Sequence, residues 1–395
     1  MSDDIGKKTI RDIDVAGKRV LVRADLNVPM ENGTVTDDTR IKESLPTIQY
    51  LLEHGAHVIV CSHLGRPKGP SPELSLAPIA GRMSNLLGRE VLFADDCVGP
   101  VAEAAVAAMG NHVLLLENLR FHAEEEKNDP EFARQLASLA DVFVNDAFGA
   151  AHRAHASTEG VTHFLPSVAG FLMEKEVRYL SALVANPPKP FAAVVGGAKV
   201  STKIPAIEHL LPKIDMLLVG GGMANTFLKA TGVNVQMSLV EDEQVEAAKR
   251  ILERAKADGV EVHLPVDVIA ASKFAEDAEA LVRGVGEIPK GYMVLDIGPE
   301  TVKQYATALK RAKAVVWNGP MGVFEMEKFS KGSFDLARAI ANLDAVTVVG
   351  GGETAAVVAQ AGLQARFTHV STGGGASLEM LEGRALPGVT ALMDS

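Results

Sequence analysis

Short apolar runs alternate with amphipathic, helix-like stretches along almost the whole chain. The runs are rich in valine and leucine and lack polar alternation, which is typical of parallel strands covered on both faces. They are Arg19–Arg23, His57–Cys61, Val113–Glu117, Val142–Asn145, Phe191–Val195, Met216–Val219, Val262–Pro265, Met293–Asp296, Ala314–Trp317 and Val346–Gly350. The helix-like stretches between them include Ile41–His54, Val101–Met109, Asp242–Asp258 and Pro299–Lys310. The pattern predicts an α/β protein with two doubly wound, Rossmann-like parallel sheets.

A connector is predicted near the middle of the chain. Glu174–Val184 has a helical pattern, and the proline-rich run Asn186–Pro190 ends it. We therefore expect a first domain over residues 1–172, a hinge helix over 173–188 and a second domain over 189–370. The pattern alone does not place the last segment, 371–395.

Length and composition support this division and limit the classes of partner that we expect. The 395 residues, 47% of them apolar, suffice for two full-sized cores. A net charge of −11 argues against nucleic acid as a partner. Cys61 and Cys97 lack metal-type spacing, so we expect reduced thiols in a cytoplasmic protein. The first residues lack an apolar signal core, and no run approaches the roughly 18 apolar residues of a membrane span.

Glycine clusters follow three strands of the second half, in Val194–Lys203, Val316–Glu325 and Val349–Ala355. Glycine lets the backbone approach a phosphate, and a helix N-terminus after such a turn offers free N–H groups. Lys199 and Lys203 are four apart, which predicts one helix face. Neither the dinucleotide fingerprint nor the Walker A spacing is present, yet the set favours nucleotide binding.

Two glutamates accompany these turns. Glu353 supplies a carboxylate that could reach a magnesium ion directly or through water. Glu325 could accept hydrogen bonds from ribose hydroxyls.

Four strand-end runs in the first half each carry an arginine. They are Arg23–Pro29, Ser62–Pro67, Glu117–His122 and Ala151–His155. Arginine is the preferred group for paired contacts to carboxylate or phosphate, so the runs predict a small-anion site. No nucleophile–base arrangement appears in the sequence. Phosphoryl transfer to an acceptor that is already an anion needs no general base, only positioning and positive charge.

The ordered set of motifs resembles the signature segments of phosphoglycerate kinases over essentially the whole chain. The set adds Gly196–Lys203, Gly220–Phe227, Trp317–Glu325, Gly350–Thr354 and Val370–Ser377 to the four arginine runs. The resemblance implies a glycolytic enzyme that transfers the acyl phosphate of 1,3-bisphosphoglycerate to ADP, giving 3-phosphoglycerate and ATP. It implies ATP/ADP with Mg²⁺, a cytoplasmic monomer, 3-phosphoglycerate on the first domain and the nucleotide on the second. It also implies that the segment 371–395 returns to the first domain.

Roles follow from this resemblance, motif by motif. Substrate binding would fall to Asp25, Asn27, Arg40, His63, Leu64, Gly65, Arg66, Arg120 and Arg153, and catalysis to Arg40, Lys199 and Lys203. Nucleotide binding would fall to Gly197, Lys203, Asn318, Glu325, Gly351, Gly352, Glu353 and Thr354, with Glu353 on the metal. Leu26 stands where the family commonly has phenylalanine, and Glu353 where many members have aspartate.

Two rival interpretations stay open at this point. One is a nicotinamide-dependent dehydrogenase on the same fold class, and the other is a two-lobed, non-catalytic anion-binding protein. The missing dinucleotide spacing disfavours the first, and the lysine and glycine set of the second half disfavours the second.

Overall fold

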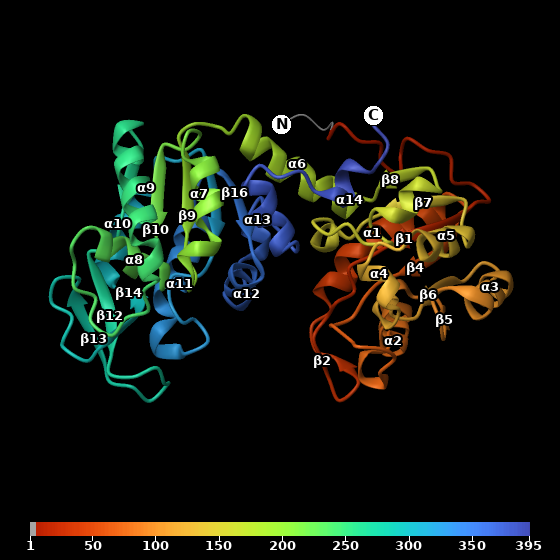
Figure 1. The fold of residues 1–395 in the computed structure, drawn as a ribbon, viewed down its shortest axis with the longest axis horizontal. Helices are drawn as coiled ribbons and strands as arrows, with labels where there is room; N and C mark the ends of the chain where they lie inside the picture. The colour runs from red at the N-terminus through yellow and green to blue at the C-terminus, as the bar shows by residue number, and fades with distance from the viewer. Residues whose placement is uncertain (1–4) are drawn as a thin grey trace. The chain divides into compact units, whose positions relative to one another are not determined.

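A computed structural model describes residues 5–395 and divides the chain into two compact units. The first unit holds the chain up to Arg178 together with Ala385–Ser395, and the second holds Tyr179–Arg384. Each unit has a six-stranded parallel sheet, as Figure 1 shows in red to yellow for the first and in green to blue for most of the second. The predicted fold class is confirmed.

The first unit's sheet has the strand order β5-β6-β4-β1-β7-β8. Its strands are β1 (Arg19–Arg23), β4 (His57–Cys61), β5 (Val91–Ala94), β6 (Val113–Leu116), β7 (Val142–Asn145) and β8 (Ser167–Ala169). A separate hairpin pairs β2 (Met30–Glu31) with β3 (Thr34–Val35). From β1 the chain moves first to one side of the sheet and later, at β7, to the other. The strand order therefore reverses at β1, which is where ligands bind in open α/β sheets.

Successive residues of these strands face two separate cores. Val20 and Val22 of β1 belong to a cluster with helices α1 (Thr39–Glu53) and α2 (Ala77–Leu87). Leu21, between them, belongs to a cluster that includes residues of α3 (Gly99–Ala108) and α5 (Pro130–Ser138). Both faces of the sheet are thus covered, which is why its strands show no polar alternation.

The second unit's sheet has the order β11-β10-β9-β15-β16-β17. Its strands are β9 (Phe191–Val195), β10 (Met216–Val219), β11 (Glu261–His263), β15 (Ala314–Asn318), β16 (Val346–Gly350) and β17 (His369–Val370). The order reverses between β9 and β15, so the loops after these two strands meet at a second topological switch point.

A three-stranded antiparallel sheet stands apart from this parallel sheet. It pairs β12 (Asp267–Ala271) with β13 (Ala280–Gly284) on one side and β14 (Met293–Ile297) on the other. The expectation that Met293–Asp296 belongs to a parallel sheet is therefore wrong. β13 has no buried residue and β12 is mostly buried, so neither strand has a regular alternation that would mark it in the sequence.

Local sequence sets the helix limits. In α1, Ile41, Leu45 and Ile48 recur at helical spacing and are buried. In α5, the Asp129 carboxylate accepts from the N–H groups of Glu131 and Phe132, and Pro130 follows it at the first position. The remaining α-helices are α4 (Ala123–Glu126), α6 (Phe171–Ala185), α7 (Ile204–Leu210), α8 (Met223–Ala230), α9 (Val245–Ala257), α10 (Pro299–Leu309), α11 (Lys331–Ala341), α12 (Gly352–Gln360), α13 (Gly375–Leu381) and α14 (Pro387–Thr390).

The division between the units falls inside α6, between Arg178 and Tyr179. The chain rejoins the first unit at Ala385, later than the 371 expected from the resemblance. The intervening stretch stays with the second unit because the Ser371 N–H donates to the Val349 carbonyl at 2.9 Å and α13 packs against α7. No helix within residues 5–395 is long and apolar enough to cross a membrane. Both cysteines are buried free thiols.

Candidate active site

Loops at the carboxyl ends of β1, β4, β6 and β7 bring the four arginine runs of the first unit together at one edge of its sheet, the cationic edge. After β1, the Asp25 carboxylate accepts from Arg40 Nη1 at 2.6 Å, and Asp25 is only 4% exposed. Two residues later, Asn27 Oδ1 accepts from the Gly65 N–H at 2.9 Å. The predicted residues Asp25, Asn27, Arg40 and Gly65 therefore form one connected group.

Asn118, at the end of β6, fixes the loop that follows β4. Its side-chain amide donates to the Leu64 carbonyl at 2.8 Å, while its Oδ1 accepts from the N–H groups of Leu64 and Arg120. Arg120 in turn donates to the Gly65 carbonyl at 2.9 Å. Sequence reasoning quoted Asn118 inside a motif but gave it no role. Its signal was an amide two residues before the arginine in that motif.

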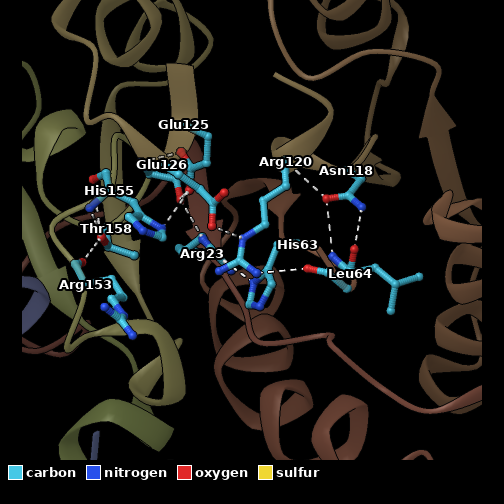
Figure 2. A network of polar contacts seen from close by, with 12 residues as sticks. Arg23, His63, Leu64, Asn118, Arg120, Glu125, Glu126, Arg153, His155 and Thr158 are labelled. Atoms are coloured by element: carbon cyan, nitrogen blue, oxygen red, sulfur yellow. Dashed lines mark hydrogen bonds and ion pairs between the residues drawn. The ribbon is translucent and has the colours of Figure 1, made fainter. Parts of the chain in front are cut away.

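His63 and Arg23 lie beneath this edge in a buried polar network (Figure 2). Arg23 Nη2 lies 3.0 Å from His63 Nδ1, and the two residues are 0% and 6% exposed. Burial, together with Arg23, Arg120, Arg40 and His155, holds the pKa of His63 well below its usual value. His63 is thus a neutral hydrogen-bonding group among arginines.

Arg66 and Arg153 differ from these residues because both are exposed. The main chain of Arg153 is anchored, since its carbonyl accepts from the Thr158 hydroxyl at 2.7 Å. Arg120 is mostly buried, and burial lowers its pKa. The edge therefore combines fixed, partly buried cations with two exposed arginines, an arrangement suited to a small polyanion.

The second unit has a cavity of about 450 Å³ at its switch point. It is lined by Gly197, Ala198, Gly221, Gly222, Met237, Leu239, Phe274, Met293, Val294, Leu295, Pro320, Gly322, Val323, Glu325 and Glu353. Glycine turns and two carboxylates meet a largely apolar wall here. That combination fits a nucleotide, whose base is flat and apolar and whose sugar and phosphates are polar.

The glycine turns touch each other through their backbones. A side-chain carbon on Gly221 would lie 2.5 Å from the Gly197 nitrogen, and one on Gly319 would lie 2.1 Å from the Gly196 oxygen. Both glycines also have positive φ angles, 66° and 102°. Larger residues are excluded at both positions, so backbone N–H groups remain close to any ligand in the cavity.

A lysine and an amide lie beside the cavity. Lys203 Nζ donates to Asn318 Oδ1, and burial lowers the pKa of Lys203. The other end of the amide, Asn318 Nδ2, is buried and has no hydrogen-bond partner among the described residues. An orphaned donor next to a lysine fits the phosphates of a nucleotide.

Helix α12 begins at the same place. Gly351, with φ 91°, precedes Gly352 and Glu353 in the first turn, and Glu353 faces the cavity. The Thr354 hydroxyl accepts from the Gly319 N–H at 2.6 Å and so joins this helix to the loop after β15. The helix N-terminus adds free N–H groups and a partial positive charge.

The prediction of one helix face for Lys199 and Lys203 is wrong. Lys199 precedes a 3₁₀ turn, Val200–Thr202, and Lys203 precedes α7. Pro205 favours the first turn of a helix, which places the helix start at Ile204 rather than before Lys199. Lys199 is exposed, and Lys203 is partly buried.

One side-chain group of the described chain has metal-ligating atoms within 4.8 Å of one another: Asp96, Cys97 and His122. Asp96 and His122 already bond at 2.7 Å, and burial raises the pKa of the Cys97 thiol well above its usual value. A hydrogen-bonded pair beside an inert thiol accounts for this group.

A cationic site and a glycine-lined cavity on two doubly wound sheets are typical of α/β enzymes that act on a small anion and a nucleotide. Comparison with known proteins gives the family. The sequence model described as phosphoglycerate kinase matches residues 10–384, and the chain belongs to that family. It is a kinase of glycolysis, and neither rival interpretation finds support in the relatives.

Relatives and solved structures agree over the full chain. The chain is 59% identical over 392 residues to "Phosphoglycerate kinase" of Moorella thermoacetica, covering 99% of this chain and 100% of the relative. It is 58% identical over 390 residues to "Phosphoglycerate kinase, cytosolic" of Triticum aestivum, covering 97% of each. The phosphoglycerate kinase structure from Coxiella burnetii has a TM-score of 0.87 at 44% identity, with 98% of each chain covered.

Proposed function

We propose that the chain transfers the acyl phosphate of 1,3-bisphosphoglycerate directly to ADP, in line, without a covalent enzyme intermediate. The observation that supports this most is the pairing of a cationic edge on one unit with a glycine-lined cavity on the other. The acceptor is already a phosphate anion, so no general base is needed. What the residues supply is position and positive charge.

On the first unit, 3-phosphoglycerate would lie against the edge held by Asp25 and Asn27. Asp25 and Asn27 would accept from its hydroxyl and, through Gly65, set the loop of His63 and Arg66. The arginines 66, 120 and 153 would bind its phosphate and carboxylate. Arg40, held by Asp25 at 2.6 Å, would stabilise the charge of the transferring group.

On the second unit, the nucleotide would occupy the cavity with its phosphates towards Lys203 and Asn318. Glu325 would accept from the ribose hydroxyls, and Lys199 would reach the transferring group. Mg²⁺ would be held by Glu353, an exposed carboxylate in the first turn of α12 that faces the cavity. Bound magnesium would neutralise phosphate charge.

Transfer requires that the two ligands meet, so we propose that the units close around them and that residues 173–188 act as the hinge. We keep the domain limits 1–172 and 189–370 as part of this proposal, and propose that the segment returning to the first domain, expected over 371–395, begins at Ala385, where the first compact unit resumes. We further propose a cytoplasmic monomer that acts on small molecules rather than on nucleic acid or membranes. Cytosolic relatives support this location, although a relative named chloroplastic is also 57% identical.

The variant Arg40→Ala tests the proposed mechanism. We expect kcat to fall about 100-fold, because a charge that acts in the transition state is lost. Steady-state kinetics in the ATP-forming direction measure this. Arg134→Ala is the control, since that arginine is exposed and forms an ion pair with Glu131, on α5 and away from the site. A kcat within about threefold of the unmodified enzyme would rule out the role given to Arg40.

A further inference from the structure

Arg23 is a completely buried arginine at the end of β1. Its guanidinium makes three contacts inside the protein: Nε donates to Ser157 Oγ at 2.8 Å, Nη1 donates to the Ala24 carbonyl at 2.6 Å, and Nη2 approaches His63 Nδ1 at 3.0 Å. Burial of a cation is costly unless it is compensated. The three contacts and a compensating charge must therefore stabilise the buried Arg23 cation.

Glu125, in α4, compensates this charge through Ser157. Glu125 is also 0% exposed, and its two carboxylate oxygens accept from the Ser157 hydroxyl at 2.5 Å and from the Ser157 N–H at 3.0 Å. The Ser157 hydroxyl has one proton, which it gives to Glu125, so its oxygen is free to accept from Arg23. The two hydrogen bonds that connect Glu125 to Arg23 through the Ser157 hydroxyl thus each have a fixed direction.

The same logic fixes the proton on His63. Arginine has only donors, so His63 Nδ1 must accept from Arg23, and the proton of the neutral ring must be on Nε2. Figure 2 labels both residues within this network, and the distance from Arg23 Nη2 to His63 Nδ1 is 3.0 Å. The ring is then a donor at one nitrogen only.

We propose that Arg23 is a positioning residue that sets the tautomer and orientation of His63, and that Glu125 and Ser157 hold Arg23 in place for this purpose. His63 would then present an Nε2–H donor to an anionic ligand before the ligand arrives. The surrounding arginines supply the charge of the site, and His63 supplies a directed hydrogen bond. Such prior orientation spares the ligand the cost of ordering the ring.

This inference deepens the proposed function, because it rests on 3-phosphoglycerate binding at the edge that carries His63. Its first test needs no substrate. Two-bond ¹H–¹⁵N spectra of protein labelled with ¹⁵N-histidine report the tautomer of each ring, and the His63→Gln variant assigns the His63 signal. We expect a neutral Nε2–H ring from pH 6 to 8, since burial above all, and then the charges of the surrounding arginines, lower the pKa of His63.

The variants Ser157→Ala and Arg23→Lys test the chain of contacts. Both should allow the His63 signal to shift towards a mixture of tautomers, and both should raise KM for 3-phosphoglycerate, about three- to tenfold for Ser157→Ala, with kcat within about twofold. Ser167→Ala is the matched control: Ser167 is 1% exposed and donates to the Leu165 carbonyl at 2.8 Å, outside the network. Ser167→Ala should change neither the His63 signal nor KM for 3-phosphoglycerate.

Three results would overturn the inference. They are an Nδ1–H or doubly protonated His63 ring in the unmodified protein at pH 7, an unchanged His63 signal in both variants, and an unchanged KM where the tautomer has changed. If Arg23→Lys does not fold, Ser157→Ala decides alone. A protein that lacks turnover of 3-phosphoglycerate but shows the expected spectra would contradict the proposed function and leave the role of Arg23 in place.

Discussion

Single side chains of the first unit owe their positions to residues far away in the sequence. Asn118 sets the loop of Leu64 and Gly65, and Glu125 reaches Arg23 through Ser157. The sequence showed Arg23 as one of four strand-end arginines, all of which looked alike. Its complete burial depends on residues more than 100 positions later, and no local pattern encodes that. The grouping of residues that share a local motif was predictable from the sequence, whereas the burial of Arg23 was not.

Asp296 shows the same dependence in the second unit. It is 1% exposed and accepts from the N–H groups of Gly332 and Ile297, and burial raises its pKa to about 8. Between the ordinary value of 3.8 and about 8, the folded protein keeps a proton that the unfolded chain has released. This group's contribution to stability is therefore complete at low pH and is lost as the pH rises through that window.

We expect the Asp296→Asn variant to reveal this pH-dependent contribution of Asp296 to stability. An amide cannot titrate, but its NH₂ group opposes one of the two N–H donors, so the variant should be less stable than the unmodified protein at pH 5 by about 1–3 kcal/mol. The deficit should shrink towards pH 8. Urea unfolding followed by the fluorescence of Trp317, the one tryptophan, measures it. A deficit that is constant with pH would contradict the raised pKa.

At the scale of elements, the strands that lie in the middle of the parallel sheets were the most predictable. β1, β4, β7, β9, β10 and β16 have the predicted limits because buried runs of valine and leucine mark them clearly. The strands β12 and β13 were missed, since a strand in a small, half-exposed sheet is stabilised by its partners and not by its own pattern. The glycine turns were located correctly, but their contacts with one another could not be read from sequence.

The bond between the loop after β15 and α12 should matter for nucleotide binding. Thr354→Val keeps the shape of the side chain and leaves the buried Gly319 N–H without its acceptor. We expect KM for ADP to rise about tenfold, while KM for 1,3-bisphosphoglycerate stays unchanged. Thr347→Val is the control, because Thr347 is 2% exposed and accepts from Thr368, within the pairing of β16 and β17. Equal effects on both substrates would contradict a local role.

At the scale of the whole molecule, each unit has its own core. Leu115 belongs to a cluster of the first unit and Leu218 to one of the second, and both are 0% exposed. Chains built from two such units often unfold in more than one step. The sequence predicted two domains correctly in number, because two separate series of strands are visible along the chain.

We expect Leu115→Ala to destabilise the first unit by about 2–5 kcal/mol through lost burial and the resulting cavity. Far-UV circular dichroism should then show an earlier transition, while the Trp317 transition of the second unit moves much less. Leu218→Ala should shift the Trp317 transition instead. If both signals move together in both variants, the two cores unfold as one cooperative unit.

The antiparallel sheet of β12, β13 and β14 has a consequence for how nucleotide preference can change. Met293, Val294 and Leu295 of β14, and Phe274 between β12 and β13, line the cavity, yet none of them belongs to the parallel sheet. Much of the apolar wall is thus an insert between β11 and β15, although Met237, Leu239 and Val323 lie outside it, and the glycine turns belong to the parallel sheet. Exchange of this insert would remodel that part of the wall and leave the glycine turns in place.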